Sequence, residues 1–151
     1  LTNDRRLHAT EALVTDAVER GARLLAGGRR IGDRGFFYAP TVLADVPDTA
    51  RAMSEEPFGP IAMVNRFAGV EQAVELANRL PYGLGAYIFT GDRKSALAFL
   101  NGVESGTVGI NTFQLTVPET PFGGVKDSGI GREGGAAGLE AYLTTKFVSA
   151  A

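Results

Sequence analysis

Strand-like and helix-like segments alternate between residues 61 and 111, and this alternation restricts the chain to few architectures. The first helix-like segment presents Val70, Ala73 and Val74 as one apolar stripe, as expected of a helix that packs on a sheet. We predict strands at 61–67, 84–90 and 107–111, and helices at 70–78 and 93–101. Strands that alternate with helices in this way form parallel βαβ units, so the predicted fold class is α/β.

The N-terminal third predicts a less regular arrangement. Apolar residues recur at helical spacing within residues 10–20, and Gly21 follows as a stop signal. We expect a helix there, followed by a short strand at 22–26 and by glycine-rich turns. An extended run at 36–43 contains Pro40, which indicates an edge strand because proline cannot donate to a sheet ladder.

Residues 112–135 show no periodic pattern and contain two prolines and six glycines. This long loop leaves the carboxyl end of the last strand of the alternating region, which is where open parallel sheets bind ligands. We expect Asn111, at that strand end, to hydrogen-bond neighbouring backbone and fix the loop. A short helix at 136–143 and a final strand at 144–149 complete the predicted elements.

Charge and hydropathy argue against two classes of partner. The formal net charge is -2 and no lysine- or arginine-rich run is present, so we expect no nucleic-acid partner. No apolar stretch approaches the roughly 18 residues that a membrane span requires, and no signal-peptide pattern is visible. We therefore expect no membrane partner and a cytoplasmic location.

The chain has no cysteine and a single histidine. Cysteine nucleophiles, thiolate zinc sites and histidine clusters are thereby excluded from these residues, and we predict no metal site. The histidine, His8, lies in a polar stretch and is interpreted as a solvated surface side chain.

Two motifs invite a functional interpretation. The residues from Gly129 to Gly134 match G-x-G-x-x-G, but no buried strand precedes them, so a dinucleotide-binding turn is disfavoured. The pair Glu55 and Glu56 precedes a rigid Pro-Phe-Gly-Pro turn. Neighbouring side chains of an extended chain point to opposite faces, so at most one of the two carboxylates can serve a site, and an acidic surface turn is the simpler interpretation.

Four motifs, taken together and in order, resemble the aldehyde dehydrogenase superfamily. They are Glu55-Glu56-Pro57-Phe58-Gly59-Pro60, Tyr82-Gly83-Leu84, Gly106-Thr107-Val108-Gly109-Ile110-Asn111 and Pro121-Phe122-Gly123-Gly124-Val125-Lys126 with Ser128-Gly129. The resemblance implies that residues 1–143 form the C-terminal half of a catalytic domain and residues 144–151 an oligomerisation strand. Among subfamilies, the chain is most similar to dehydrogenases of succinic or 2-oxoglutaric semialdehyde.

In the family that the chain resembles, a cysteine thiolate attacks the aldehyde, hydride passes to NAD or NADP, and a glutamate activates the hydrolytic water. Both catalytic residues precede the matching segment, so we expect no catalytic residue here and no activity of the chain alone. The resemblance implies that Glu56 accepts hydrogen bonds from the nicotinamide ribose and that Phe58 packs against it. Phe122 would line the aldehyde tunnel, and Thr116 would lie near the substrate carboxylate.

Two hypotheses follow. In the first, the chain belongs to an NAD(P)-dependent semialdehyde dehydrogenase, with the nicotinamide cofactor and a small aldehyde as partners and a homo-oligomer formed through residues 144–149. In the second, the chain is a separately encoded, non-catalytic interaction module that pairs through the same terminal strand.

Overall fold

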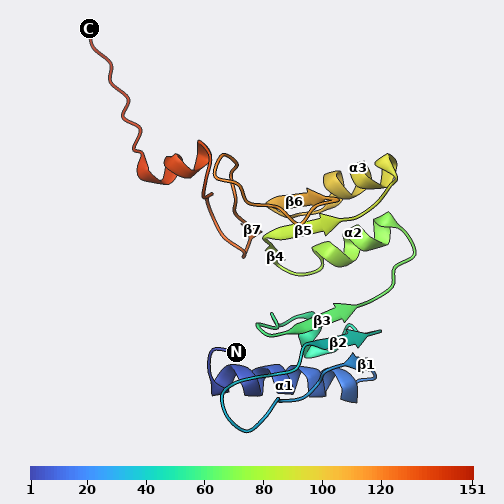
Figure 1. The fold of residues 1–151 in the computed structure, drawn as a ribbon. Helices are drawn as coiled ribbons and strands as arrows, with labels where there is room; N and C mark the ends of the chain where they lie inside the picture. Colours follow the sequence, from blue (N-terminus) through green and yellow to red (C-terminus); the bar gives the residue numbers. More distant parts are fainter. The chain divides into compact units, whose positions relative to one another are not determined.

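The computed structural model describes all 151 residues, and the chain divides into two compact units. Unit 1 comprises Leu1–Arg66 and unit 2 comprises Phe67–Ala151 (Figure 1). Both contain parallel strands and helices, which confirms the α/β class. No helix combines the length and the apolar character needed to cross a membrane.

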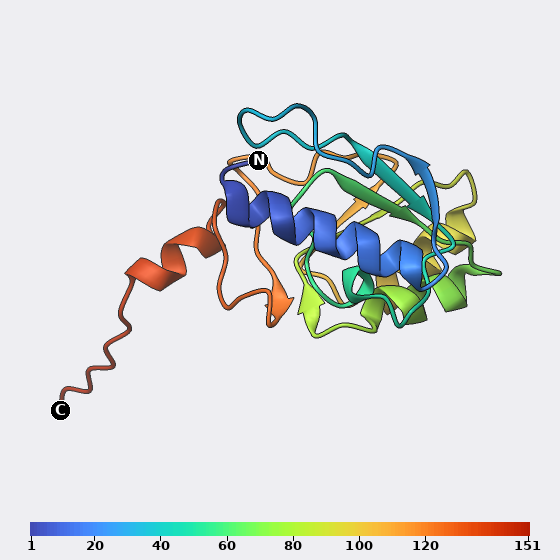
Figure 2. The ribbon, with the colours of Figure 1, turned by 90° about the horizontal axis from the view of Figure 1, so that it is seen from below.

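Unit 1 is a three-stranded sheet with a helix on one face (Figure 2). Its strand order is β1-β2-β3, with β1 antiparallel and β3 parallel to the central strand. The elements are α1 (Asp4–Glu19), β1 (Arg23–Ala26), β2 (Thr41–Ala44), the short 3-10 helix η1 (Arg51–Met53) and β3 (Ile61–Val64).

Helix α1 begins six residues before the predicted start at residue 10. Asn3 caps it, because its side-chain oxygen accepts a hydrogen bond of 2.9 Å from the backbone N–H of Arg6. The first turn is polar and hides the apolar periodicity, although Leu7 is buried on the same face as the residues that follow. His8 is confirmed as an exposed side chain, 3.2 Å from the Asp4 carboxylate.

The prediction that the run containing Pro40 is an edge strand is wrong. Strand β2 begins at Thr41 and lies in the middle of the sheet. Pro40 directly precedes the strand, so its missing N–H removes no hydrogen bond from either ladder.

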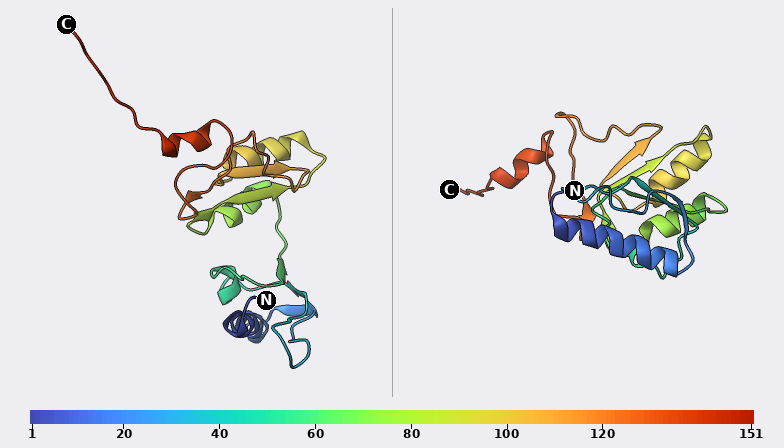
Figure 3. Two further views of the ribbon diagram at one scale, coloured as in Figure 1. Left: turned by 60° about the vertical axis from the view of Figure 1, so that its left-hand side comes forward. Right: turned by 60° about the horizontal axis from the view of Figure 1, so that its bottom comes forward.

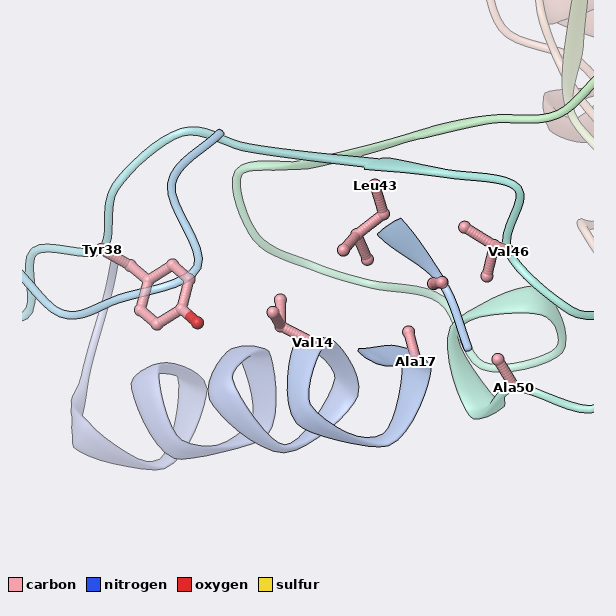
Figure 4. Packing of buried hydrophobic residues seen from close by; sticks show 7 residues of the cluster. Val14, Ala17, Tyr38, Leu43, Val46 and Ala50 are labelled. Atoms are coloured by element: carbon pink, nitrogen blue, oxygen red, sulfur yellow. The ribbon is translucent and has the colours of Figure 1, made fainter. Parts of the chain in front are cut away.

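The core of unit 1 lies between α1 and the sheet (Figure 4). Val14 and Ala17 point from the helix toward Leu43 of β2, which is completely buried. Tyr38, Val46 and Ala50 close the ends of this layer. Burying an apolar face of the helix against a sheet in this way removes both from water, which is the main stabilising contribution to such a unit.

Unit 2 contains two helices and two small sheets. Its elements are α2 (Val70–Asn78), β4 (Tyr82–Gly83), β5 (Gly85–Ile88), α3 (Arg93–Gly102), β6 (Thr107–Ile110), β7 (Val125–Lys126) and the 3-10 helix η2 (Ala137–Tyr142). Strands β5 and β6 pair in parallel, and β4 pairs with β7 in antiparallel orientation.

The predicted alternation of strands and helices is confirmed, and one complete βαβ unit lies within unit 2. Helix α3 connects β5 to its parallel neighbour β6, as predicted. The preceding strand, β3, pairs in parallel with β2 in unit 1. Alternation along the chain identifies element types, but it does not identify the strand with which each one pairs.

Asparagine side chains tie the ends of these elements together. Asn111 follows β6 with a left-handed φ of 55°, donates to the carbonyl of Thr90 at 3.0 Å and accepts from its N–H at 2.9 Å. This confirms the prediction that the Asn111 side chain hydrogen-bonds neighbouring backbone. Asn78, at the end of α2, similarly donates to the carbonyl of Gly102 and accepts from the N–H of Glu104.

The C-terminal residues leave the body of unit 2 (Figure 3). Residues 144–151 are exposed and pair with no strand of the chain. The predicted helix at 136–143 is present as the 3-10 helix η2. A terminal segment of this kind can become a strand only when another sheet edge supplies its hydrogen bonds, so the oligomerisation strand stays a prediction.

A chain of charged groups joins α1 to η1. The Asp16 carboxylate accepts from the backbone N–H of Arg51 and from Nε of Arg20, each at 2.8 Å. The Arg51 guanidinium donates two hydrogen bonds, of 2.7 and 3.0 Å, to Glu55. These bonds lower the pKa of Asp16, through the Arg51 N–H first, and the pKa of Glu55, through the Arg51 side chain.

Replacing Arg51 with glutamine should therefore destabilise unit 1 near neutral pH but much less in acid. A carboxyl group whose pKa is lowered by folding stabilises the fold above its ordinary pKa, and the contribution is lost as the pH falls through the folded value. The groups are exposed, so the effect on the urea midpoint should be small. We expect the difference between Arg51→Gln and wild type to be largest at pH 7 and to shrink below about pH 4.

Arg34→Gln is the matched control, because this exposed arginine forms none of the ion pairs of the structure. A difference that is the same at pH 7 and pH 3 would contradict the assignment of the Glu55 charge to Arg51.

Candidate functional site

Glu56 and Phe58 lie on the turn between η1 and β3, residues 54–60. The turn is tight, since the N–H of Phe58 donates to the carbonyl of Glu56 at 3.0 Å and that of Gly59 to the carbonyl of Pro57 at 2.6 Å. Phe58 retains 65% exposure, although large aromatic side chains are usually well buried. The turn thus bears an exposed aromatic residue and an exposed carboxylate two positions apart.

The first turns of α1 support this turn. Thr10 is 3% exposed, and its hydroxyl donates to the carbonyl of Arg6 at 2.8 Å. A Cβ on Gly59 would lie 2.5 Å from Thr10 Oγ1, closer than any side chain tolerates without displacement. Only glycine therefore lets the turn pack this closely on the helix. The Arg6 guanidinium, from the same helix, lies over the Phe58 ring.

The two neighbouring glutamates have different surroundings. Glu55 is held by both nitrogens of the Arg51 fork, which is a strong geometry for a carboxylate. Glu56 is exposed and takes part in no ion pair or hydrogen bond of its side chain within the chain. Of the two, only Glu56 has a carboxylate free to accept hydrogen bonds from a ligand.

Thr116 and Phe122 lie in the loop at 112–135 of unit 2. Phe122 is half-buried and exchanges two backbone hydrogen bonds of 2.7 Å with Glu133. Thr116 is exposed, and its hydroxyl is not engaged by a neighbouring group. The backbone of Phe122 is therefore fixed, whereas Thr116 has a free hydroxyl.

Glycines of three motifs meet where this loop is anchored. The N–H of Gly106 donates to the carbonyl of Gly83 at 3.0 Å, and a Cβ on Gly106 would collide with the carbonyl oxygen of Gly123. The N–H of Gly83 is in turn bonded to the hydroxyl of Ser128 at 2.9 Å. These glycines are required because backbone meets backbone, and they hold the loop in place.

The G-x-G-x-x-G sequence does not form a dinucleotide-binding turn. Gly129, Gly131 and Gly134 have positive φ angles, but no strand of a parallel sheet leads into them. The element that follows is the short η2, which is a 3-10 helix and supplies no long α-helical N-terminus for a pyrophosphate. The disfavoured interpretation is therefore excluded by the fold.

Two features of the structure were not expected from the sequence. One is the contact of Arg6 with Phe58, which joins residues far apart in the chain. The other is an exposed aromatic cluster, in which Phe113 contacts Tyr87 and Phe89 with ring centroids 5.5 and 4.7 Å apart. The Arg51 and Glu55 pair could have been found, because its four-residue spacing is visible in the sequence.

A nicotinamide nucleotide would fit the turn at residues 54–60. A free carboxylate accepts hydrogen bonds from paired hydroxyls, as a ribose offers, and an exposed aromatic face packs against a sugar or a flat ring. The two groups come from one turn that α1 holds in place. No three acidic, histidine or cysteine side chains are grouped so that they could hold a metal ion.

Comparison with known proteins places these features in a family. The family model described as the aldehyde dehydrogenase family matches residues 1–148. The 4-(hydroxymethyl)benzenesulfonate dehydrogenase TsaD1 of Comamonas testosteroni is 48% identical over 144 residues, which cover 95% of this chain and 30% of that protein. A probable NADP(+) succinate-semialdehyde dehydrogenase of Sinorhizobium fredii is 45% identical, with 98% of this chain and 30% of that protein covered.

A solved structure gives the same result for the fold. The crystal structure of succinate-semialdehyde dehydrogenase from Burkholderia pseudomallei superposes with a TM-score of 0.89 at 40% identity, covering 93% of this chain and 29% of that one. The chain thus spans about a third of the length of the relatives that it matches. Because the family model matches nearly all of its residues, the chain belongs to the aldehyde dehydrogenase family.

Proposed function

We propose that the whole protein is an NAD(P)-dependent dehydrogenase that oxidises a semialdehyde to the acid. The observation that carries this proposal is the turn at residues 54–60, which bears one free carboxylate and one exposed ring in a chain of the aldehyde dehydrogenase family. Glu56 accepts hydrogen bonds from the nicotinamide ribose, and Phe58 packs against it. The assignment of the protein to the cytoplasm stays a prediction from the sequence.

This chain contributes binding and positioning to the reaction. When bound, the nicotinamide accepts the hydride that leaves the substrate carbon. The 151 residues contain no cysteine, so we assign the nucleophilic thiolate to residues outside them and expect no turnover by these residues alone. Glu56 fixes the ribose, and with it the distance and angle at which hydride is transferred.

The substrate residues of the proposal are Thr116 and Phe122. The fixed backbone of Phe122 suits a wall residue, and the free hydroxyl of Thr116 suits an anionic group. A relative that is 45% identical is named for succinate semialdehyde, which supports a carboxylate as that group. A relative from Pseudomonas putida that is 41% identical is named for 3-sulfolactaldehyde, so a sulfonated aldehyde is the competing substrate class.

Glu56→Gln in the full-length protein should weaken productive cofactor binding about ten- to a hundredfold, because hydrogen bonds to a charged acceptor contribute about 1.5–3 kcal/mol. The rate of hydride transfer should fall as well, since a misplaced ribose also misplaces the ring. Calorimetric titration of the cofactor and single-turnover formation of the reduced nucleotide measure the two effects separately.

Glu55→Gln is the matched control, because its carboxylate is already held by Arg51. It should leave cofactor binding nearly unchanged. If Glu55→Gln were the damaging change, or if Glu56→Gln altered neither affinity nor rate, the assignment of Glu56 to the ribose would be wrong.

Thr116→Val should raise the Michaelis constant for carboxylated semialdehydes about tenfold and leave that for neutral aldehydes of similar length almost unchanged. Only the anionic substrates lose a charge-assisted hydrogen bond. Steady-state kinetics with succinic semialdehyde, a sulfonated aldehyde and butanal distinguish the classes. Equal changes for all three would remove Thr116 from the substrate site.

Deletion of residues 144–151 should lower the oligomeric mass of the full-length protein. We propose that this exposed segment adds as a strand to a sheet of a neighbouring subunit, which would satisfy backbone groups that have no partner strand in the chain. Light scattering coupled to size-exclusion chromatography measures the mass. An unchanged mass would show that subunits associate elsewhere.

A further inference from the structure

Arg6 lies over the Phe58 ring with its guanidinium carbon 5.4 Å from the ring centroid. A guanidinium at this distance is attracted by the negative face of the aromatic π system. Arg6 takes part in none of the ion pairs of the structure. Its positive charge is therefore directed at the ring and is not neutralised by a carboxylate.

The backbone of Arg6 is held from both sides. Its N–H is bonded to the side chain of Asn3 at 2.9 Å, and its carbonyl accepts from the hydroxyl of Thr10 at 2.8 Å. Thr10 is also the residue on which Gly59 packs. Thr10 thus contacts both the backbone of Arg6, which carries the charge, and the turn of Phe58, which carries the ring.

Arg6 lies over one face of Phe58, and 65% of the residue remains exposed, which leaves surface of the ring for a ligand on its other face. The proposed function places the nicotinamide against this ring. An oxidised nicotinamide carries a positive charge and a reduced one carries none. A fixed cation on one face of Phe58 therefore repels a ligand on the other face only while that ligand is oxidised.

We propose that Arg6 is a positioning residue for Phe58 whose charge makes the site favour reduced over oxidised nicotinamide; this inference rests on the proposed function. In hydride transfer, the C–H bond of the thiolate adduct of the aldehyde would break while the electron pair of its oxygen anion forms the C=O bond. The hydrogen would leave with both electrons of the C–H bond and make a new C–H bond at the nicotinamide ring, whose positive charge would be lost. The repulsion between Arg6 and the nicotinamide thus weakens as the reaction proceeds. A repulsion that is weaker in the transition state than in the ground state lowers the barrier and accelerates the step.

The test is calorimetric binding of NAD+, NADH, NADP+ and NADPH to the full-length protein and its Arg6 variants. The measured quantity is the Kd of the oxidised form divided by the Kd of the reduced form. This ratio should be about three- to tenfold lower in Arg6→Gln than in wild type. Contacts to phosphate cancel in this ratio, since both forms carry the same phosphates. Arg6→Lys keeps the charge and should keep a ratio close to that of wild type.

Two further variants separate the effect of the charge over Phe58 from the effect of removing any positive charge from α1. Arg5→Gln removes the same charge from a neighbouring, exposed position of α1 and should leave the ratio unchanged. In a Phe58→Leu background, Arg6→Gln should shift the ratio less, because the guanidinium has lost the ring that holds it. A ratio that is the same in Arg6→Gln and wild type, or an equal shift in Arg5→Gln, would overturn the inference.

Failure of the inference differs from failure of the proposed function. If Glu56→Gln weakens both redox forms as expected while Arg6→Gln leaves their ratio unchanged, only the role of Arg6 is wrong. If the protein binds neither cofactor, the proposed function is wrong and the role of Arg6 falls with it.

Discussion

Both units depend on places where the absence of a Cβ lets two parts of the chain touch. In unit 1, Gly59 packs on the buried Thr10, which seats the turn of Glu56 and Phe58 on α1. In unit 2, Gly106 meets the backbone of Gly123, which anchors the loop of Thr116 and Phe122. A side chain at Gly59 would displace Thr10, one at Gly106 would force two backbones apart, and either change would move residues that we assign to ligands. The motif glycines therefore have a structural role that explains their residue type.

The sequence predicts the elements best where local signals are complete. Helix α2 occupies the predicted residues 70–78, because an apolar stripe and a following Leu-Pro pair define it. The start of α1 was missed, since its first turn is polar and only the Asn3 cap marks it. The pairing of β3 with β2 could not be predicted, because strand partners are chosen by packing across the whole unit.

The candidate site shows the same division between local and distant signals. That at most one glutamate of the pair could serve a ligand followed from the alternation of side chains in an extended chain. The structure adds that the Arg51 guanidinium binds the Glu55 carboxylate. The support that Thr10 and Arg6 give to the turn at residues 54–60 joins segments far apart in the chain, and no local pattern predicts it. Thr116 and Phe122 were proposed from the resemblance alone, and their roles stay predictions.

The two neighbouring glutamates have different structural roles, because only one of them pairs with an arginine. A lone carboxylate beside Arg51 would be bound by it, because a guanidinium fork and a carboxylate match in geometry. Glu55 takes that position and leaves Glu56 without a competing cation at its side chain. The second cation near the turn, Arg6, lies against the Phe58 ring. Each positive charge at the turn thus has its own partner, and Glu56 is the carboxylate that remains without one.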